Sequence, residues 1–247
     1  MPSTSLPPWL QALLTRRMLI CVITGFASGL PLYLLLNLVP AWLRTEGINL
    51  KTIGLFALIQ FPYTWKFLWA PLLDRFSPLA LGRRRSWMLV TQIGLIAVIA
   101  LLGQTSPQGL VAPVDFNSAL ALLLHPVTLA VSAVALLSAT QDIALDAFRR
   151  EVLSDEELGL GNSVHVNAYR IAGLVPGSLS LILADQMSWD WVFAITALFM
   201  LPGAIMSVMV TEPTIAGNAP KTLRAAVVEP FNEFMGRAGW RLSLIHI

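Results

Sequence analysis

Six long apolar stretches constrain the fold of this chain more than any other feature of its sequence. A transmembrane helix needs about 20 consecutive, mostly apolar residues. Hydrophobic residues make up 56% of the chain and charged residues only 12%, and the mean hydropathy is +0.70, which together exclude an ordinary soluble domain. We therefore predict an all-α integral membrane protein. The expected spans are residues 18–43, 53–73, 87–103, 127–148, 163–184 and 191–210.

Prolines and glycines inside these stretches bear on how the helices bend and pack. A proline removes a backbone donor and can kink its helix, and small residues four apart let two helices approach closely. The prolines are Pro31, Pro40, Pro176 and Pro202, and the glycines are Gly25, Gly29, Gly173 and Gly177.

The basic residues predict the orientation in the membrane. Under the six-span reading, most of them fall on one side, which the positive-inside rule places in the cytoplasm. Only Arg44 and Lys51 fall on the other side, and the connection 104–117 is expected to be external. The basic residues on the cytoplasmic side are Arg16, Arg17, Arg75, Arg83, Arg84, Arg85, Arg149, Arg150, Lys221 and Arg224.

The same reading divides the chain into four parts. Residues 1–17 form a cytoplasmic N-terminus, 18–210 a six-helix transmembrane bundle, and 211–241 a cytoplasmic middle segment. Within that segment, residues 223–235 alternate apolar and polar side chains well enough to lie on the membrane surface. Residues 242–247 match the translation of a common sequencing adapter read in frame, so we expect them not to be native.

The chain offers little for several other classes of function. The net charge is only +2 and no nucleic-acid-binding motif is present. A single cysteine, Cys21, excludes an intramolecular disulfide and a cysteine metal site. His125 and His165 have no partner at metal-binding spacing and are expected at the membrane interface. No cofactor is expected.

Two aspartates near the end of the fourth apolar stretch are the first functional candidates. Asp142 and Asp146 stand four residues apart, so their Cβ atoms share a helix face at roughly 5–6 Å. A carboxylate in hydrocarbon is costly, and such residues normally face a bundle interior or a wet path. Two like charges this close disfavour joint ionisation at low dielectric, which suits proton coupling.

Two basic residues are expected at the same depth as the aspartates. At about 1.5 Å per residue, Lys66 lies roughly 20 Å from the outer face and Arg170 roughly 12 Å from the inner face. Two positive and two negative groups at one level nearly cancel. The four residues form either a gate or coupling cluster, or a static network that holds helices together. Arg149 and Arg150 follow Asp146 by three and four residues and offer it a purely local pairing.

Two uncharged residues within spans complete the candidates. Asn37 and Gln60 could hydrogen-bond a sugar or peptide in a substrate cavity, or could bond between helices.

A loop between the second and third stretches combines acidic and basic residues. Asp74 and Arg75 are followed, after a short insertion, by Arg83, Arg84 and Arg85. An acidic helix end and an arginine cluster across a tight turn can lock two helices through charge-assisted hydrogen bonds, or the arginines can simply anchor at the interface. The arrangement resembles the loop signature of the major facilitator superfamily, although Ala70 and residues 76–81 depart from it.

A set of motifs in order narrows this resemblance to the AmpG-type muropeptide permeases. The matching segments are residues 25–31, 49–54, 66–69, 82–85, 141–147 and 169–170, and the similarity runs from residue 18 to about 236. The resemblance implies a twelve-helix major facilitator protein of the bacterial inner membrane that imports anhydro-muropeptides with protons for cell-wall recycling. It makes this chain the N-terminal half, with a C-terminal six-helix half as its partner.

Other readings stay open at this point. The acetyl-coenzyme A transporters share the general pattern, and a non-transporting facilitator relative could act as a sensor. A different class, the membrane prenyltransferases, also uses aspartates four apart to hold magnesium. That chemistry needs a second aspartate-rich motif, and Asp185 and Asp190 stand at the opposite membrane face from the pair.

Overall fold

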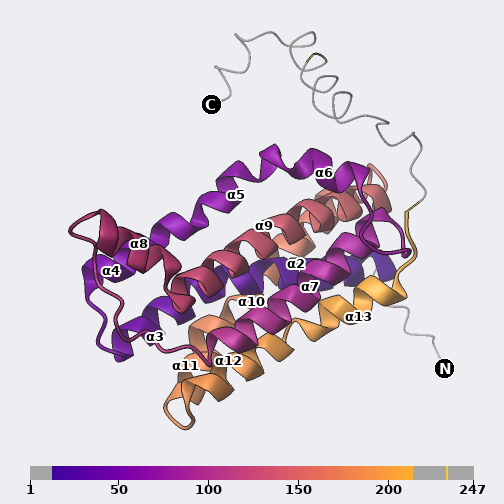
Figure 1. The fold of residues 1–247 in the computed structure, drawn as a ribbon. Helices are drawn as coiled ribbons and strands as arrows, with labels where there is room; N and C mark the ends of the chain where they lie inside the picture. The colour runs from indigo at the N-terminus through magenta and orange to yellow at the C-terminus, as the bar shows by residue number, and fades with distance from the viewer. Residues whose placement is uncertain (1–12, 214–231, 233–247) are drawn as a thin grey trace, which may run out of the picture.

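The computed structural model describes residues 13–213 and Asn232. Within this described part the chain is helical and contains no strand. Its helices run side by side between two ends (Figure 1). We call one of them the arginine end. It holds the starts of α2 (Arg16–Tyr33), α7 (Arg83–Leu102) and α10 (Leu158–Ala172) and the ends of α9 (Pro126–Val152) and α13 (Leu201–Met209). At the opposite end lie α3 (Val39–Thr45), α8 (Phe116–Leu124) and the turn between α11 (Ser180–Ala184) and α12 (Trp189–Leu198).

Five helical stretches of the described residues are long and apolar enough to cross a membrane. Within the described residues the predicted all-α class is therefore confirmed, and these five stretches are candidate membrane spans. These stretches are Arg16–Thr45, Arg83–Leu102, Pro126–Val152, Leu158–Ala184 and Trp189–Met209.

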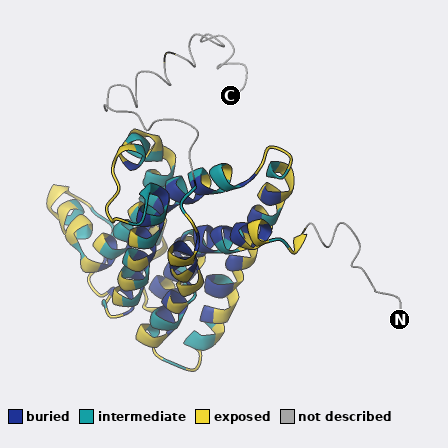
Figure 2. Ribbon diagram, turned by 90° about the vertical axis from the view of Figure 1, so that its right-hand side faces the viewer, coloured by how far each residue is buried: buried dark blue, intermediate teal, exposed yellow. Residues whose placement is uncertain are grey.

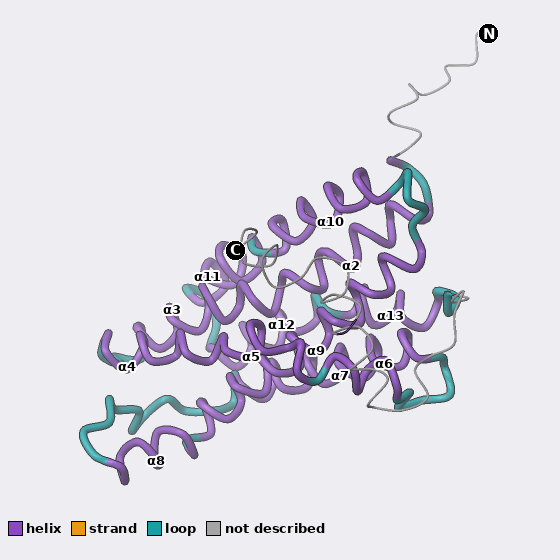
Figure 3. Tube along the Cα trace, turned by 90° about the horizontal axis from the view of Figure 1, so that it is seen from above, coloured by secondary structure: helices purple, strands orange, loops and turns teal. Residues whose placement is uncertain are grey.

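The remaining expected span, residues 53–73, is not one of these five. This segment lies alongside α9 (Figures 1 and 3), but it is broken into short pieces. Pro62 and Pro71 lie in the first turns of two of the pieces, and each lacks the N–H that would continue the preceding helix. The pieces are α4 (Leu50–Leu55), a 3₁₀ turn (Phe56–Gln60), α5 (Phe61–Trp65), a second 3₁₀ turn (Lys66–Leu68) and α6 (Ala70–Arg75).

Prolines also accompany interruptions in three of the five long stretches. A π-helical segment, Leu34–Leu38, follows Pro31 and separates α2 from α3, in whose first turn Pro40 lies. A second π-helical segment, Val175–Leu179, contains Pro176. Pro202 stands in the first turn of α13, after α12 has ended. The expected irregularities at these four prolines are confirmed.

The core lies between the helices and is built from large apolar side chains. Trp42, Phe148 and Phe193 are fully buried, and the edge of the Trp42 ring meets Phe193 with 5.2 Å between ring centroids. Figure 2 shows buried positions on the faces that helices turn toward one another and exposed positions on the outside. Many of the exposed side chains are Leu, Ile and Phe, as expected for helices that face hydrocarbon.

Several helix boundaries differ from those expected. The third span begins at Arg83 instead of residue 87, because Gly82 (φ +99°) makes the turn and the arginines form the first helical turn. The helix α8 was not anticipated, although Asp115 and Ser118 form a capping box at its start. The expectations for residues 223–235 and 242–247, and most of those for 211–241 and for the N-terminal segment 1–17, lie outside the described residues.

Candidate functional site

Asp142 on α9 is held from two sides. Ser28 of α2 donates a 2.6 Å hydrogen bond to its Oδ1, and the Lys66 Nζ lies 3.8 Å from its Oδ2. Lys66 Nζ also lies 3.9 Å from Oδ2 of Asp146, one turn further along the helix. Lys66, which was expected only at the depth of the two aspartates, thus contacts both of them. The 3₁₀ turn that begins at Lys66 places this lysine beside α9.

A cavity of about 380 Å³ opens next to this ion pair and is lined from α2, α9 and α10. We call it the carboxylate cavity. Arg170, on the last turn of α10, lines it and is exposed. Among the described residues, no carboxylate forms an ion pair with Arg170. The lining residues are Ser28, Tyr33, Asp142, Asp146, His165, Val166, Tyr169 and Arg170.

Close packing of α2 on α10 positions these walls. A Cβ atom at Gly25 would collide with the carbonyl oxygen of His165, and one at Gly29 with that of Tyr169. The helices can therefore approach to backbone contact, and the expectation from glycine spacing is confirmed for this pair. One consequence is that Tyr33 and Tyr169 meet edge to face, with ring centroids 5.6 Å apart. A second is that Gly29 brings Ser28 to the cavity wall.

The two aspartates differ in exposure and in partners. The side chain of Asp142 is 14% exposed, whereas that of Asp146 is 51% exposed. Arg149 pairs with Asp146 at 3.0 Å, as its i+3 spacing predicts. Arg150 does not share this role, because it pairs with Asp155 at 2.9 Å instead. Asp142 is thus the enclosed member of the pair, and Asp146 faces the open part of the cavity.

This arrangement has two chemical capabilities. A poorly solvated carboxylate beside one amine and one hydroxyl can change its ionisation when a neighbour moves. The Arg170 guanidinium, which lines the same cavity and pairs with no carboxylate of the described residues, can bind a carboxylate or phosphate of a solute through two parallel hydrogen bonds. The cavity therefore combines a titratable carboxylate with a guanidinium that is chemically able to bind an anion.

Sequence reasoning missed several residues of this cavity. Ser28, Tyr33 and Tyr169 were not candidates, although Ser28 adjoins one of the glycines that signal close packing. The interfacial placement expected for His165 is wrong. Because α10 begins at Leu158, His165 lies two turns into the helix, is buried and hydrogen-bonds with Thr24 of α2 at 3.3 Å.

A second charged cluster lies at the arginine end. Arg84 is buried, and its guanidinium donates to Asp74 at 2.7 Å and to Glu151 at 2.8 Å. The expected locking of α6 to α7 through Asp74 is therefore present. Glu151, on the last turn of α9, was not anticipated, and it extends the lock to a third helix.

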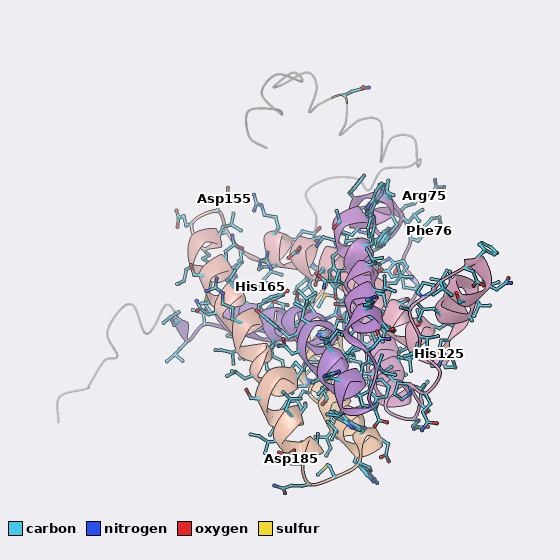
Figure 4. All side chains as sticks on the ribbon, turned by 90° about the vertical axis from the view of Figure 1, so that its left-hand side faces the viewer. Arg75, Phe76, His125, Asp155, His165 and Asp185 are labelled. Atoms are coloured by element: carbon cyan, nitrogen blue, oxygen red, sulfur yellow. The ribbon has the colours of Figure 1, made fainter. Side chains whose placement is uncertain are left out.

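The neighbouring basic residues of this loop have separate partners. Arg83 donates to the backbone oxygen of Asp74 at 2.7 Å, and Arg85 donates to the backbone oxygens of Ser207 and Val208. Arg75 lies over the ring of Phe76, 5.4 Å from its centroid. Figure 4 labels this last pair.

The uncharged candidates do not line the carboxylate cavity. Asn37 is exposed on the first π-helical segment and touches Gly177, and Gln60 ends the first 3₁₀ turn. A larger cavity, of about 430 Å³, lies between the broken segment, α8 and α9 and is lined almost entirely by apolar side chains. It therefore lacks the chemistry of a charged-solute site.

The described residues contain no group of three or more His, Cys, Asp or Glu side chains that could hold a metal ion. His125 caps α9 at the opposite end, apart from His165 (Figure 4). The prenyltransferase reading therefore gains no support from the described part of the chain.

The fold and this cavity define the class of a multi-pass helical membrane protein with a charged site between its helices. The sequence matches the model of the family described as Acetyl-coenzyme A transporter 1 over residues 17–182. The chain belongs to this transporter family.

Curated relatives agree with this assignment. The chain is 47% identical to an uncharacterised protein of Haemophilus influenzae over 91% of the chain and 50% of that protein. It is 41% identical to the anhydromuropeptide permease of Escherichia coli K12 over 93% of the chain and 44% of that protein, and 28% identical to the putative transporter AmpG 4 of Rickettsia felis over 87% and 51%. The resemblance to AmpG-type permeases is thus confirmed. All three relatives are bacterial, and two of them are named as a permease or a putative transporter. Together with the five apolar helices, this indicates a multi-pass inner-membrane protein.

Proposed function

We propose that the full-length protein is a proton-coupled importer of anhydro-muropeptides. One observation carries the proposal. Arg170, which has no carboxylate partner among the described residues, lines the same cavity as Asp142 and Asp146, which Lys66 contacts. An anionic glycopeptide offers carboxylates for the guanidinium and sugar faces for the tyrosine pair. The name of the Escherichia coli relative supports this choice of substrate.

The chain spans about half the length of the curated relatives that it matches. Residues 18–210 would then form a six-helix half, in which the broken segment 50–75 is the second of the six spans. A second six-helix half would complete a twelve-helix major facilitator fold. The cavity would lie between the halves. We place the arginine end in the cytoplasm, because ten basic residues were assigned to that side against two on the other.

Proton coupling would use Asp142. In one state its carboxylate pairs with Lys66, as observed. Movement of the broken segment away from α9 would remove the lysine and favour protonation, and a group whose proton affinity differs between two states couples protons to movement.

The test is uptake of labelled anhydro-muropeptide by membrane vesicles that contain the full-length protein, with and without a proton gradient. Gradient-dependent accumulation supports the proposal. Its absence in vesicles that contain folded protein would refute it.

The description of the matched family favours a second candidate, transport of acetyl-coenzyme A. This solute is also anionic and could bind Arg170. Uptake of labelled acetyl-coenzyme A by the same vesicles separates the two candidates, because only a transported solute accumulates inside them.

A further inference from the structure

A third cavity, of about 240 Å³, opens at the arginine end where α2 begins and α9 and α13 end. Its floor is apolar, and its buried members are Ile20 of α2, Phe148 of α9 and Val210, which follows α13. Arg16 and Arg17 stand exposed at its rim. Figure 1 shows the three helix ends together. The cavity thus has a cationic rim above an apolar floor.

The positive charge at this rim is only partly compensated by the described residues. Arg17 forms an ion pair with Glu157 at 2.6 Å, but Arg16 has no carboxylate partner among residues 13–213. Arg84, Arg149 and Arg150, at the same end, each pair with a carboxylate. The cavity rim is therefore a site where an external anion would find a free guanidinium.

The two halves of the cavity specify an amphipathic anion. Phosphate oxygens accept strong, charge-assisted hydrogen bonds from guanidinium groups. Apolar side chains directly below would contact the first carbons of acyl chains and exclude water from the ion pair. A soluble phosphate would use only the rim, whereas a phospholipid would use both parts. Basic pockets between transmembrane helices are known sites for anionic lipid headgroups.

We propose that this cavity binds an anionic phospholipid, with its phosphate on Arg16 and Arg17 and its acyl chains against Ile20, Phe148 and Val210. Bound there, the lipid joins the ends of α2, α9 and α13. Because α2 and α9 also carry Ser28 and Asp142, the lipid would stabilise the helix pair that holds the carboxylate cavity. The inference does not depend on the identity of the transported solute.

Native mass spectrometry of the full-length protein in nonionic detergent tests the proposal. The protein is titrated with phosphatidylglycerol, phosphatidylcholine and sn-glycerol 3-phosphate. We expect phosphatidylglycerol to bind more tightly than phosphatidylcholine, by about fivefold for each arginine, and glycerol phosphate not to compete at equal concentration. Arg16→Gln should remove about fivefold of that preference. Equal binding of the two lipids, or an unchanged preference in Arg16→Gln, would overturn the site.

Three further variants separate the pocket from general surface charge. Val152→Trp fills the floor while both arginines remain, so it should abolish the preference for phosphatidylglycerol. A Val152→Trp protein that is folded and keeps the full preference would contradict a lipid pocket. Glu157→Gln frees Arg17 and should leave binding equal or tighter, and weaker binding would count against the proposal. Arg44→Gln, at the opposite end, is the matched control and should bind as the unchanged protein does; a loss of preference there would show nonspecific charge attraction.

Discussion

Ser28 and Asp142, 114 residues apart in the chain, meet in a 2.6 Å hydrogen bond that joins α2 to α9. The other oxygen of the same carboxylate faces Lys66 at the longer distance of 3.8 Å. Ser28 lies on α2, which packs tightly against α10. Lys66 lies in the broken segment 50–75, which runs alongside α9. The carboxylate is thus shared between a firmly packed element and one whose helix is interrupted.

Asp142→Asn in the full-length protein should abolish gradient-driven accumulation of substrate while the protein still reaches the membrane. The amide can still accept the Ser28 hydrogen bond but cannot exchange a proton or pair with Lys66. Asp146→Asn should reduce uptake less, because Asp146 is half exposed and pairs with Arg149 within its own helix. Vesicle uptake with and without a proton gradient, together with membrane content, measures both variants.

Two outcomes would contradict this assignment. Uptake equal to that of the unchanged protein in both variants would remove the aspartates from the mechanism. Loss of Asp142→Asn protein from the membrane would favour a static structural network.

Arg170→Gln should raise KM for an anionic substrate by about tenfold or more, because a charge-assisted hydrogen bond contributes about 1.5–3 kcal/mol. Arg170→Lys should recover part of the loss, since it keeps the charge but not the fork geometry. Concentration dependence of initial uptake rates measures the effect. Arg150→Gln, which removes an exposed ion pair with Asp155, is the control, and an equal change in both variants would contradict a substrate contact.

Arg84→Ala should destabilise the full-length protein by about 3–5 kcal/mol, because it leaves Asp74 and Glu151 without their shared buried partner. Denaturant unfolding in detergent measures the free energy of unfolding. Arg150→Ala should cost at most about 1 kcal/mol, as exposed pairs do. A similar, small loss in both variants would show that the buried lock contributes little.

Gly29→Ala should destabilise the protein by about 1–3 kcal/mol through overpacking, because the new methyl group collides with the Tyr169 carbonyl oxygen. Gly159→Ala, on α10, meets open space and should be neutral or slightly stabilising. Thermal unfolding of the two variants side by side provides the comparison. If Gly29→Ala matched Gly159→Ala, close contact between α2 and α10 would not limit stability.

The Arg17–Glu157 pair should make stability depend on pH. Hydrogen bonds from Ser154, and then the pairing with Arg17, lower the pKa of Glu157 below its ordinary value of 4.5. The ionised form is therefore favoured in the folded state, and its contribution is complete above pH 4.5 and lost as the pH falls through the folded pKa. Unfolding midpoints of the unchanged protein and Glu157→Gln should differ at neutral pH and converge in acid. A difference that grows below pH 4.5 would contradict the sign.

Some of the site could be predicted from the sequence because it rests on spacing along one helix. The i, i+4 relation of Asp142 and Asp146 and the i, i+3 pairing of Asp146 with Arg149 are local. Counting residues along the helices also put Lys66 at the depth of the two aspartates, where it contacts both. It could not predict that Arg170 lines the cavity without a carboxylate partner among the described residues. The error at His165 came from a helix start taken five residues too late, because Gly159 and Gly161, in the first turn of α10, have low helix propensity.

The sequence alone determined that this chain forms membrane helices and that its basic residues gather mainly at one end. Each stretch is selected by its own hydrophobicity and length against the bilayer, independently of the others. Only the tertiary structure decided which side chains meet. Ser28 reaches Asp142, and Glu151 joins Arg84, because helix rotation and backbone contact set those distances. The glycines of α2 allow that contact, but the partner helix that they touch is a property of the packed bundle.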